Sequence, residues 1–315
     1  MPPRRALVRE APAVRFSHRV ETLLLKSVVS SLSRLSWPAA RERGAALGAF
    51  VGRLGLRRDV ARANLALAFP EQSQAWRERV LAEHYEELGR VAAEYPRMAA
   101  LSRAPREQVF GCWQGTEHAR AALALGRGMI FLTGHLSNFE LAGAAVSREF
   151  PMAFVAKPLS NPGAEEWVSA IRRAAGLDVL PTNIGVRGVV KRLRAGGTVA
   201  MLADQDARRD GVFVPFFRKP ASTPAGPAWF SLATGAPIVF CTCARAMDGR
   251  LELRMSPALI PQGEAHDAEA VRALTARHVA LLEAAVRERP AQWFWLHKRW
   301  KTRPPAGSDT LRKEG

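Results

Sequence analysis

Residues 128–140 read GMIFLTGHLSNFE, and this stretch decides the fold. It opens with a short run of consecutive apolar residues, and a glycine and a histidine follow directly. Such a run predicts a strand that is covered on both faces, which is typical of parallel sheets. From residue 139 the spacing of apolar residues becomes helical and remains so to about 149. The stretch therefore predicts a strand, a sharp turn at Gly134 and a helix.

The same alternation of strand and helix continues along the chain. Further strands are predicted at 152–156, 177–180, 198–202, 238–242 and 251–255. Helices are predicted at about 163–175, 186–195, 225–234 and 267–289. Apolar strands separated by helices are typical of a sheet built from parallel neighbours. We therefore predict an α/β fold with a largely parallel central sheet covered by helices, extending over residues 106–303.

The first 105 residues have a different pattern. Residues 1–20 are predicted to be a basic disordered arm, and residues 21–105 a helical region. Its apolar stripes include Leu25, Val28, Leu32 and Leu35, then residues 46–56, then a helix over 76–95 that ends at Pro96. This N-terminal helical extension either associates with a membrane or packs as a cap on the main domain. The polar residues 304–315 are predicted to be a frayed tail.

The chain is strongly basic. Its 315 residues include 46 Lys and Arg against 29 Asp and Glu, a net charge of +17. Such a surplus favours anionic partners, namely nucleic acid, phospholipid head groups or an acidic carrier protein. Residues 1–60 hold 12 basic and 4 acidic residues, and each basic group near an anionic membrane contributes about 1 kcal/mol. No recognition helix, zinc finger or RNA-binding sheet motif accompanies the charge, which argues against nucleic acid.

The cysteines and the hydropathy indicate the compartment. Cys112, Cys241 and Cys243 do not form a disulfide framework, and the Cys-x-Cys pair has no matching second pair for zinc. We interpret them as reduced thiols of the core in a cytoplasmic protein. A spanning helix needs about 20 apolar residues, and charged residues interrupt the N-terminal run over 22–37. The sequence thus argues against a secretory signal and against a transmembrane span.

His135 is the candidate catalytic base. It would lie at the carboxyl end of a parallel strand, where ligands bind in α/β sheets. An imidazole there can take a proton from a hydroxyl near neutral pH. Glu140, five residues later, could approach the ring, fix its tautomer and stabilise the imidazolium. The alternative interpretation is a histidine at a helix start with an unrelated, solvent-facing glutamate.

The segment GHLSNFE resembles the Gly-His-x4-Glu box of the lipid A late acyltransferases, the lauroyl and myristoyl transferases of lipopolysaccharide synthesis. Similar phrases follow the order of that family from about 57 to 303: NLALAFPE at 64–71, KPLSNP at 157–162, Arg172 with Gly176, DQ at 204–205 with VPFF at 214–217, and WFWLHKRWK at 293–301. The resemblance implies transfer of a fatty acyl chain from acyl carrier protein, or less often coenzyme A, to a hydroxyl of an anionic glycolipid. A lipid A precursor is the expected acceptor.

The resemblance also implies roles for individual residues. Arg172 is expected to stabilise the oxyanion beside His135 and Glu140, with the adjacent Arg173 as the alternative match. The candidate substrate-binding residues are Asn138, Lys157, Arg173, Asp204, Gln205, Phe217 and Arg299. Lys157 stands where the family has arginine, and this loses a planar bidentate donor. No metal or cofactor is implied, since the acyl thioester is a co-substrate.

Two of these assignments have a purely structural alternative. Asp204 and Gln205 follow a strand-like run and would lie on the same rim as His135. They either orient the loop or bind polar head groups there, or they simply form the turn after a strand. Phe217 either lines an acyl groove or belongs to the core, while Arg299 would offer its charge to a phosphorylated lipid or an acidic carrier.

Competing functions are a glycerol-phosphate-type acyltransferase, which has His-x4-Asp, and an inactive relative that only binds lipid. Glu140 and the tryptophan-rich phrase favour the lipid A type. We expect a peripheral protein on the cytoplasmic face of the inner membrane.

Overall fold

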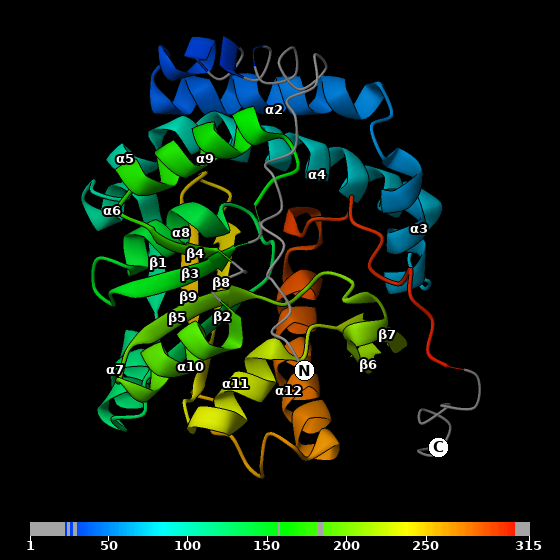
Figure 1. Cartoon of the computed structure of the whole chain (residues 1–315). Helices are drawn as coiled ribbons and strands as arrows, with labels where there is room; N and C mark the ends of the chain where they lie inside the picture. Colours follow the sequence, from blue (N-terminus) through cyan, green and yellow to red (C-terminus); the bar gives the residue numbers. More distant parts are fainter. Residues whose placement is uncertain (1–22, 24–25, 28–29, 157, 182–184, 306–315) are drawn as a thin grey trace, which may run out of the picture.

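The computed structural model describes residues 23, 26–27, 30–156, 158–181 and 185–305 (Figure 1). The predicted basic arm, and the stripe positions Leu25 and Val28, lie outside the described residues. Within them, the chain forms an α/β structure in which a seven-stranded sheet is flanked by helices.

The central sheet is largely parallel, as predicted. Its strand order is β1-β9-β8-β2-β5-β3-β4. The strands are β1 (Phe110–Gln114), β2 (Met129–Thr133), β3 (Met152–Ala156), β4 (Asp178–Pro181), β5 (Thr198–Leu202), β8 (Ile238–Arg245) and β9 (Leu251–Met255). All neighbours run parallel except β8 and β9, which pair antiparallel. The strand that leads to His135, β2, therefore lies between β8 and β5 near the middle of the sheet.

Helices bury both faces of this sheet. They are α7 (Thr116–Ala124), α8 (Phe139–Val146), α9 (Pro162–Ala174), α10 (Gly185–Arg194), α11 (Gly226–Thr234) and α12 (Ala268–Glu288). Alternate residues of β2 enter opposite cores: Ile130 and Leu132 pack in one cluster, Met129 and Phe131 in the other. This double burial explains why the strand is apolar at consecutive positions.

Two strand regions were not predicted. One is the edge strand β1, and the other is a hairpin of β6 (Val212–Phe216) and β7 (Lys219–Thr223). Phe217 and Arg218 form its turn with φ angles of 52° and 57°. Hairpin turns with positive φ normally carry glycine or asparagine, so this turn has no signature in the sequence.

The helical extension packs on the main domain. Its helices are α2 (Trp37–Arg53), α3 (Arg58–Ala68) and α4 (Gln74–Glu94), followed by the short η1 (Tyr95–Arg97), α5 (Met98–Leu101) and α6 (Arg106–Val109). Figure 1 shows α2 lying along α4 at one end of the molecule. Within the described ranges, no helix combines the length and apolarity needed to cross a bilayer.

Glycines allow α2 and α4 to touch along their backbones. A Cβ atom added at Gly89 of α4 would lie 1.9 Å from the carbonyl oxygen of Gly44, and one added at Gly48 would lie 2.0 Å from that of Tyr85. No side chain fits at such distances, so small residues fix how closely the two helices approach.

Candidate active site

The topology brings a histidine and an aspartate to the same level of the sheet. In the pairing of β2 with β5, Thr133 lies opposite Leu202. His135 and Asp204 each follow two residues later and thus extend beyond the carboxyl ends of adjacent strands. Ligands bind in α/β sheets at this edge. The side chain of His135 is 28% exposed, whereas that of Asp204 is 2% exposed.

Asp204 accepts three hydrogen bonds that fix the histidine. Its Oδ1 is 2.7 Å from Nδ1 of His135, and its Oδ2 accepts from the backbone N of His135 at 2.7 Å and from Nε1 of Trp293 at 2.9 Å. An ionised carboxylate only accepts, so Nδ1 must carry the hydrogen. In the neutral ring Nε2 then holds the lone pair that can take a proton.

The charges of the pair support this assignment. Burial alone would raise the pKa of Asp204, but the neighbouring His135 and the three donors outweigh it and lower the pKa to about 2. Burial also opposes protonation of His135, yet the Asp204 carboxylate prevails and raises the pKa of the imidazole above 6.5. Asp204 therefore stays anionic at neutral pH and stabilises the imidazolium.

The turn that carries His135 is held by backbone contacts from the far end of the chain. The amide of Ser137 donates to the carbonyl of Gln292 at 2.8 Å, and the amide of Phe294 donates to the carbonyl of His135 at 3.0 Å. Gly134 makes room for the aspartate, because a Cβ atom there would lie 3.0 Å from Oδ2 of Asp204 and 2.6 Å from Leu282. The tryptophan-rich phrase thus completes the site rather than only facing solvent.

Glu140 does not occupy the position beside the imidazole that we expected. Both of its oxygens bind Arg172, with Oε2 2.8 Å from Nε and Oε1 2.5 Å from Nη2, and Tyr95 donates to Oε2 at 2.8 Å. The carboxylate bonded to His135 is Asp204, so the structure corrects the expected pairing. The reason is the direction of α8, whose first turn presents Glu140 toward α9, where Arg172 lies.

Arg172 is consequently a fixed cation. The bonds to Glu140 outweigh burial and raise the pKa of its guanidinium. Burial, reinforced by the Glu140 charge, raises the pKa of the Tyr95 phenol, which therefore remains a donor at neutral pH. Only one edge of the guanidinium faces Glu140, which leaves N–H groups on its other edge.

An apolar cavity of about 80 Å³ lies beside these groups. Thr133, Phe139, Glu140 and Arg172 belong to its wall, together with side chains from β3, β5 and β8. The ring of Phe139 also packs edge-on against His135, with centroids 5.1 Å apart. The cavity thus lies on the far side of a ring that touches the histidine, and its apolar lining suits part of a hydrocarbon chain.

Besides Asp204, which binds His135, three more predicted substrate-binding side chains are internal. Asn138 is buried, its Oδ1 accepting from the amide of Leu141 and its Nδ2 donating to Glu94. Arg299 is fully buried and donates to the carbonyl of Ser222 and to Thr223. Phe217 packs in the core against other aromatic rings, including Phe69, and does not line the cavity. These side chains therefore hold the fold together, and the structure corrects their placement at a substrate surface.

The remaining candidates lie nearer the surface. Gln205 is half-buried in the loop after β5, next to Asp204. Arg173 is exposed on α9 and, with Arg172, lines a hollow of about 380 Å³ next to the apolar cavity. Lys157 lies outside the described residues. In the 204–206 segment, Asp206 accepts from Thr302 at 2.9 Å, and its amide donates to His297 at 2.9 Å.

Replacing Asp204 by asparagine should move the pH dependence of catalysis. In the wild type the acid limb of kcat should have its midpoint above pH 6.5, because the base is neutral only above its raised pKa. Asparagine removes the charge that raises this pKa, so the midpoint should fall while kcat drops by about 10³-fold through loss of the tautomer. The check is kcat measured from pH 5 to 9.

The matched control for this experiment is Asp206→Asn, since Asp206 binds Thr302. Its acid limb should stay at the wild-type pH. If the midpoint of the acid limb of kcat stays in place in Asp204→Asn, or moves to higher pH, the proposed role of Asp204 is contradicted.

Comparison with known proteins identifies the family to which the chain belongs. The sequence model of the family described as bacterial lipid A biosynthesis acyltransferase matches residues 9–302. The chain belongs to this family. As a member of the bacterial lipid A biosynthesis acyltransferases, it is an acyltransferase, and the resemblance seen in the sequence is confirmed.

Individual relatives are similar over most of their length. The chain is 29% identical over 275 residues to the lipid A biosynthesis palmitoleoyltransferase of Escherichia coli (strain K12), covering 86% of this chain and 88% of the relative. It is 27% identical over 279 residues to the lauroyltransferase of the same strain, with the same coverage. It is also 30% identical over 246 residues to a phosphatidylinositol mannoside acyltransferase of Mycobacterium tuberculosis (strain CDC 1551 / Oshkosh), covering 76% of each.

Proposed function

We propose that this acyltransferase moves a fatty acyl chain from acyl carrier protein, or less often coenzyme A, to a hydroxyl of an anionic glycolipid, and that the glycolipid is a lipid A precursor. The observation that carries the proposal is the His135–Asp204 pair, whose imidazole packs against Phe139 in the wall of an apolar cavity. The pair supplies a base for a hydroxyl, and the cavity supplies an apolar place for part of a hydrocarbon chain.

In the proposed reaction, Nε2 of His135 takes the proton of the acceptor hydroxyl as its oxygen attacks the thioester carbonyl. Asp204 stabilises the imidazolium that forms. The tetrahedral intermediate then expels the thiolate, which takes the proton from the imidazolium. An ester and a free thiol result, and the histidine is neutral again.

Glu140 has a supporting role in this proposal. It holds the guanidinium of Arg172 in place at the cavity wall, where the free N–H groups can meet negative charge. That charge is either the oxyanion of the tetrahedral intermediate or a phosphate of the acceptor. A cation fixed before the reaction stabilises such charge without reorganising.

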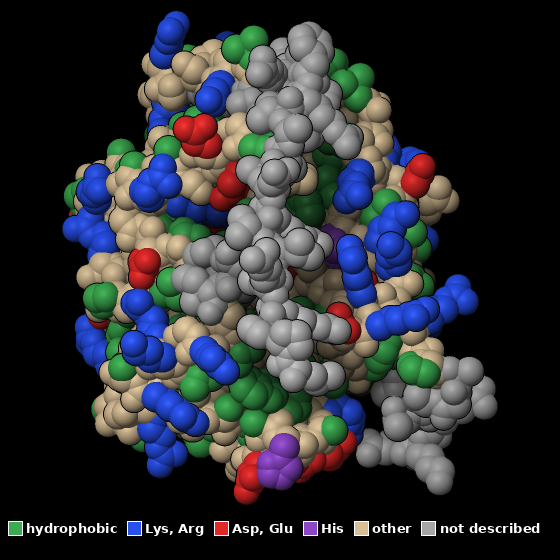
Figure 2. Space-filling model, in the orientation of Figure 1, with side chains coloured by type: hydrophobic (Ala, Val, Ile, Leu, Met, Phe, Trp, Pro, Cys, Tyr) green, Lys and Arg blue, Asp and Glu red, His purple; other side chains and the backbone are tan. Residues whose placement is uncertain are grey.

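The donor and the acceptor both carry negative charge, which suits this chain. Figure 2 shows Lys and Arg side chains spread over one face of the molecule, and the net charge is +17. Acyl carrier protein is the favoured donor because an acidic protein gains most from such a surface. A second acceptor, a mannosylated phosphatidylinositol, is suggested by the similarity to the mycobacterial phosphatidylinositol mannoside acyltransferase.

Mass spectrometry of cell lipids tests this function. Cells that lack their own lipid A acyltransferase are compared with and without this protein. The proposal expects lipid A precursor to gain the mass of one acyl chain only when the protein is present. A gain on another glycolipid would reassign the acceptor, and unchanged lipids would reject the transfer. Purified protein given acyl carrier protein or coenzyme A thioesters then identifies the donor.

We also propose that the end of α2 rests on the cytoplasmic face of the inner membrane, which makes the protein peripheral. Phe50, Leu54 and Leu56 are 54%, 69% and 57% exposed, and the exposed Arg53 and Arg57 lie among them. Apolar side chains that insert shallowly beside basic residues are typical of interfacial helices.

Changing Phe50, Leu54 and Leu56 together to serine should reduce binding to vesicles of phosphatidylglycerol and phosphatidylethanolamine by at least about tenfold, since each buried apolar side chain contributes about 1.5–3 kcal/mol. Cosedimentation measures the effect. Leu125→Ser is the control, because Leu125 is 49% exposed and ends α7, which Figure 1 places at the other end of the molecule from α2. Equal binding by the triple variant and the wild type would exclude this surface.

A further inference from the structure

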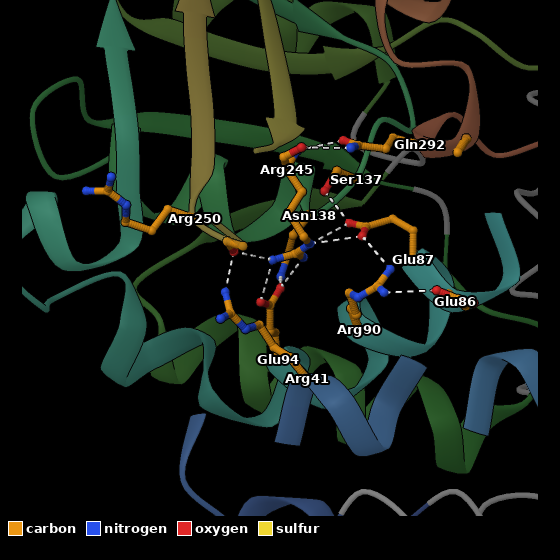
Figure 3. A network of polar contacts seen from close by, with 12 residues as sticks. Arg41, Glu86, Glu87, Arg90, Glu94, Ser137, Asn138, Arg245, Arg250 and Gln292 are labelled. Carbon is orange, nitrogen blue, oxygen red and sulfur yellow. Dashed lines mark hydrogen bonds and ion pairs between the residues drawn. The ribbon is translucent and has the colours of Figure 1, made fainter. Parts of the chain in front are cut away.

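A buried ionic cluster contacts Ser137 and Asn138, which lie in the turn that follows His135 (Figure 3). At its centre is Arg245, the last residue of β8, whose side chain is 6% exposed. Its Nε lies 3.0 and 2.9 Å from the two oxygens of Glu87, and its two Nη atoms lie 2.8 Å from those of Glu94. Glu87 and Glu94 are 5% and 0% exposed and stand two turns apart on one face of α4.

Both carboxylates also accept hydrogen bonds from side chains of the turn that follows His135. Glu87 accepts from the hydroxyl of Ser137 at 2.5 Å, and Glu94 accepts from Nδ2 of Asn138 at 2.8 Å. Asn138 also caps α8 through the amide of Leu141, at 3.1 Å. The two residues between His135 and Glu140 in this turn that carry polar side chains are therefore each bound to a carboxylate of α4.

The backbone of the turn is unusual, and a strained conformation needs support. Ser137 has a φ of 43°, in the left-handed region that side-chain-bearing residues rarely adopt. Its amide is bound to the carbonyl of Gln292, whose side chain in turn binds the backbone N and O of Arg245 at 2.6 and 2.8 Å. The turn is thus tied to α4, to the end of β8 and to the C-terminal segment at once.

Burying these three charged side chains costs free energy, and a role in stabilising the fold does not explain why they are charged. Replacing a buried ion cluster by apolar side chains of similar volume is often neutral or stabilising. Burial alone would lower the pKa of Arg245, but the two carboxylates prevail and raise it, so the guanidinium remains charged. A charged cluster that is hydrogen-bonded to a catalytic turn is suited to holding the residues of that turn in position.

We propose that Glu87, Glu94 and Arg245 are positioning residues for acyl transfer, which act by holding Ser137 and Asn138 so that His135 and Glu140 keep their places. The inference rests on the proposed function for the reaction that it serves. The guanidinium fixes the two carboxylates, the carboxylates fix the turn, and the turn sets both the base and the anchor of Arg172.

The test removes the hydrogen bonds between the cluster and the turn and leaves the cluster intact. Removing Arg245 instead would leave Glu94 buried without this cation, and Glu87 with Arg90 at 3.7 Å. Ser137→Gly removes the donor to Glu87 and also relieves the positive φ, so a merely structural role predicts a change in stability alone, with full activity. Positioning instead predicts that kcat falls about tenfold while KM for the thioester changes less than twofold. Asn138→Ser keeps a capping oxygen but loses the reach to Glu94, and the same loss is expected.

Amide hydrogen exchange provides a readout that needs no turnover. The amides of residues 136–141 should exchange at least about tenfold faster in both variants, and the rest of the chain should be unchanged. Ser147→Ala is the matched control: this hydroxyl binds the carbonyl of Ala144 at the other end of α8, so kcat and exchange should stay at wild-type values.

The outcomes separate this inference from the proposed function. Wild-type kcat in Ser137→Gly, or wild-type exchange of the turn in both variants, overturns the positioning role. Absence of acyl transfer by the wild-type protein itself counts against the proposed function and hence against the task assigned to the cluster, while the exchange data still report whether the cluster holds the turn.

Discussion

Replacing His135 by alanine is expected to lower kcat for acyl transfer by about 10²- to 10⁴-fold, the contribution typical of a general base. The imidazole is the group that Asp204 fixes in one tautomer, with Nε2 as the lone-pair atom. Alanine leaves the acceptor hydroxyl without a base, while the cavity and Arg172 remain. KM for the thioester should therefore change little. Initial rates with an acyl carrier protein thioester measure both quantities.

The control for this substitution is His266→Ala, because the side chain of His266 is 83% exposed and pairs with Glu264. It should leave kcat unchanged, and both variants should keep the wild-type circular dichroism spectrum. A His135→Ala protein with kcat within threefold of the wild type would exclude His135 as the base, whatever the result for Asp204→Asn.

Replacing Gly89 by alanine should have the largest effect on stability. The new Cβ atom would lie 1.9 Å from the carbonyl oxygen of Gly44 and 2.9 Å from the backbone N of Gly48. Backbone atoms cannot yield as a side chain can, so α2 must move away from α4, and overpacking of this kind costs about 1–3 kcal/mol. For a chain of this size we expect a fall in Tm of about 2–4 °C per kcal/mol, measured by calorimetry.

The expected loss of stability in Gly89→Ala is informative because it is opposite in sign to the usual effect of this substitution in a helix. In an unconstrained helix, glycine to alanine stabilises by about 0.8–1 kcal/mol. Gly111→Ala in β1 is the control, since its Cβ atom would lie 3.5 Å from the guanidinium of Arg250, an ordinary contact with the end of a flexible side chain. It should keep or raise Tm. A rise in Tm for Gly89→Ala as well would show that the two helices can separate freely.

The strands and helices around the site were predictable because their signals are local. Met152–Ala156, Thr198–Leu202 and Leu251–Met255 form the strands that their apolar runs predicted. The β6–β7 hairpin was missed because its turn uses Phe217 and Arg218 at positive φ, where hairpins usually carry glycine or asparagine. The close crossing of α2 and α4 was also missed, although Gly44, Gly48 and Gly52 recur at four-residue spacing.

The location of the histidine was predictable, but its partner was not. Glu140 was favoured because it is near in the sequence, whereas Asp204 is 69 residues away and becomes adjacent through the pairing of β2 with β5. Strand order is a property of the whole fold and leaves little trace in one sequence. The available signal was that Asp204, like His135, directly follows a buried strand.

Charged and aromatic residues were misplaced for a related reason. Arg299 was expected at the surface because most arginines are exposed, yet it is fully buried and bonded to Ser222 and Thr223. Glu87, Glu94 and Arg245 were not singled out at all, since each resembles an ordinary polar residue until α4 and β8 bring them together. Burial of charge depends on partners that are distant in the chain.

The contact of residues 290–295 with the histidine turn has a consequence for synthesis of the protein. Trp293 supplies a donor to Asp204, and Gln292 and Phe294 pair with the turn. A nascent chain on the ribosome therefore lacks part of the support of its catalytic histidine until residues beyond 295 have emerged. Acyl transfer should accordingly begin only after this segment has been translated and has left the ribosomal tunnel.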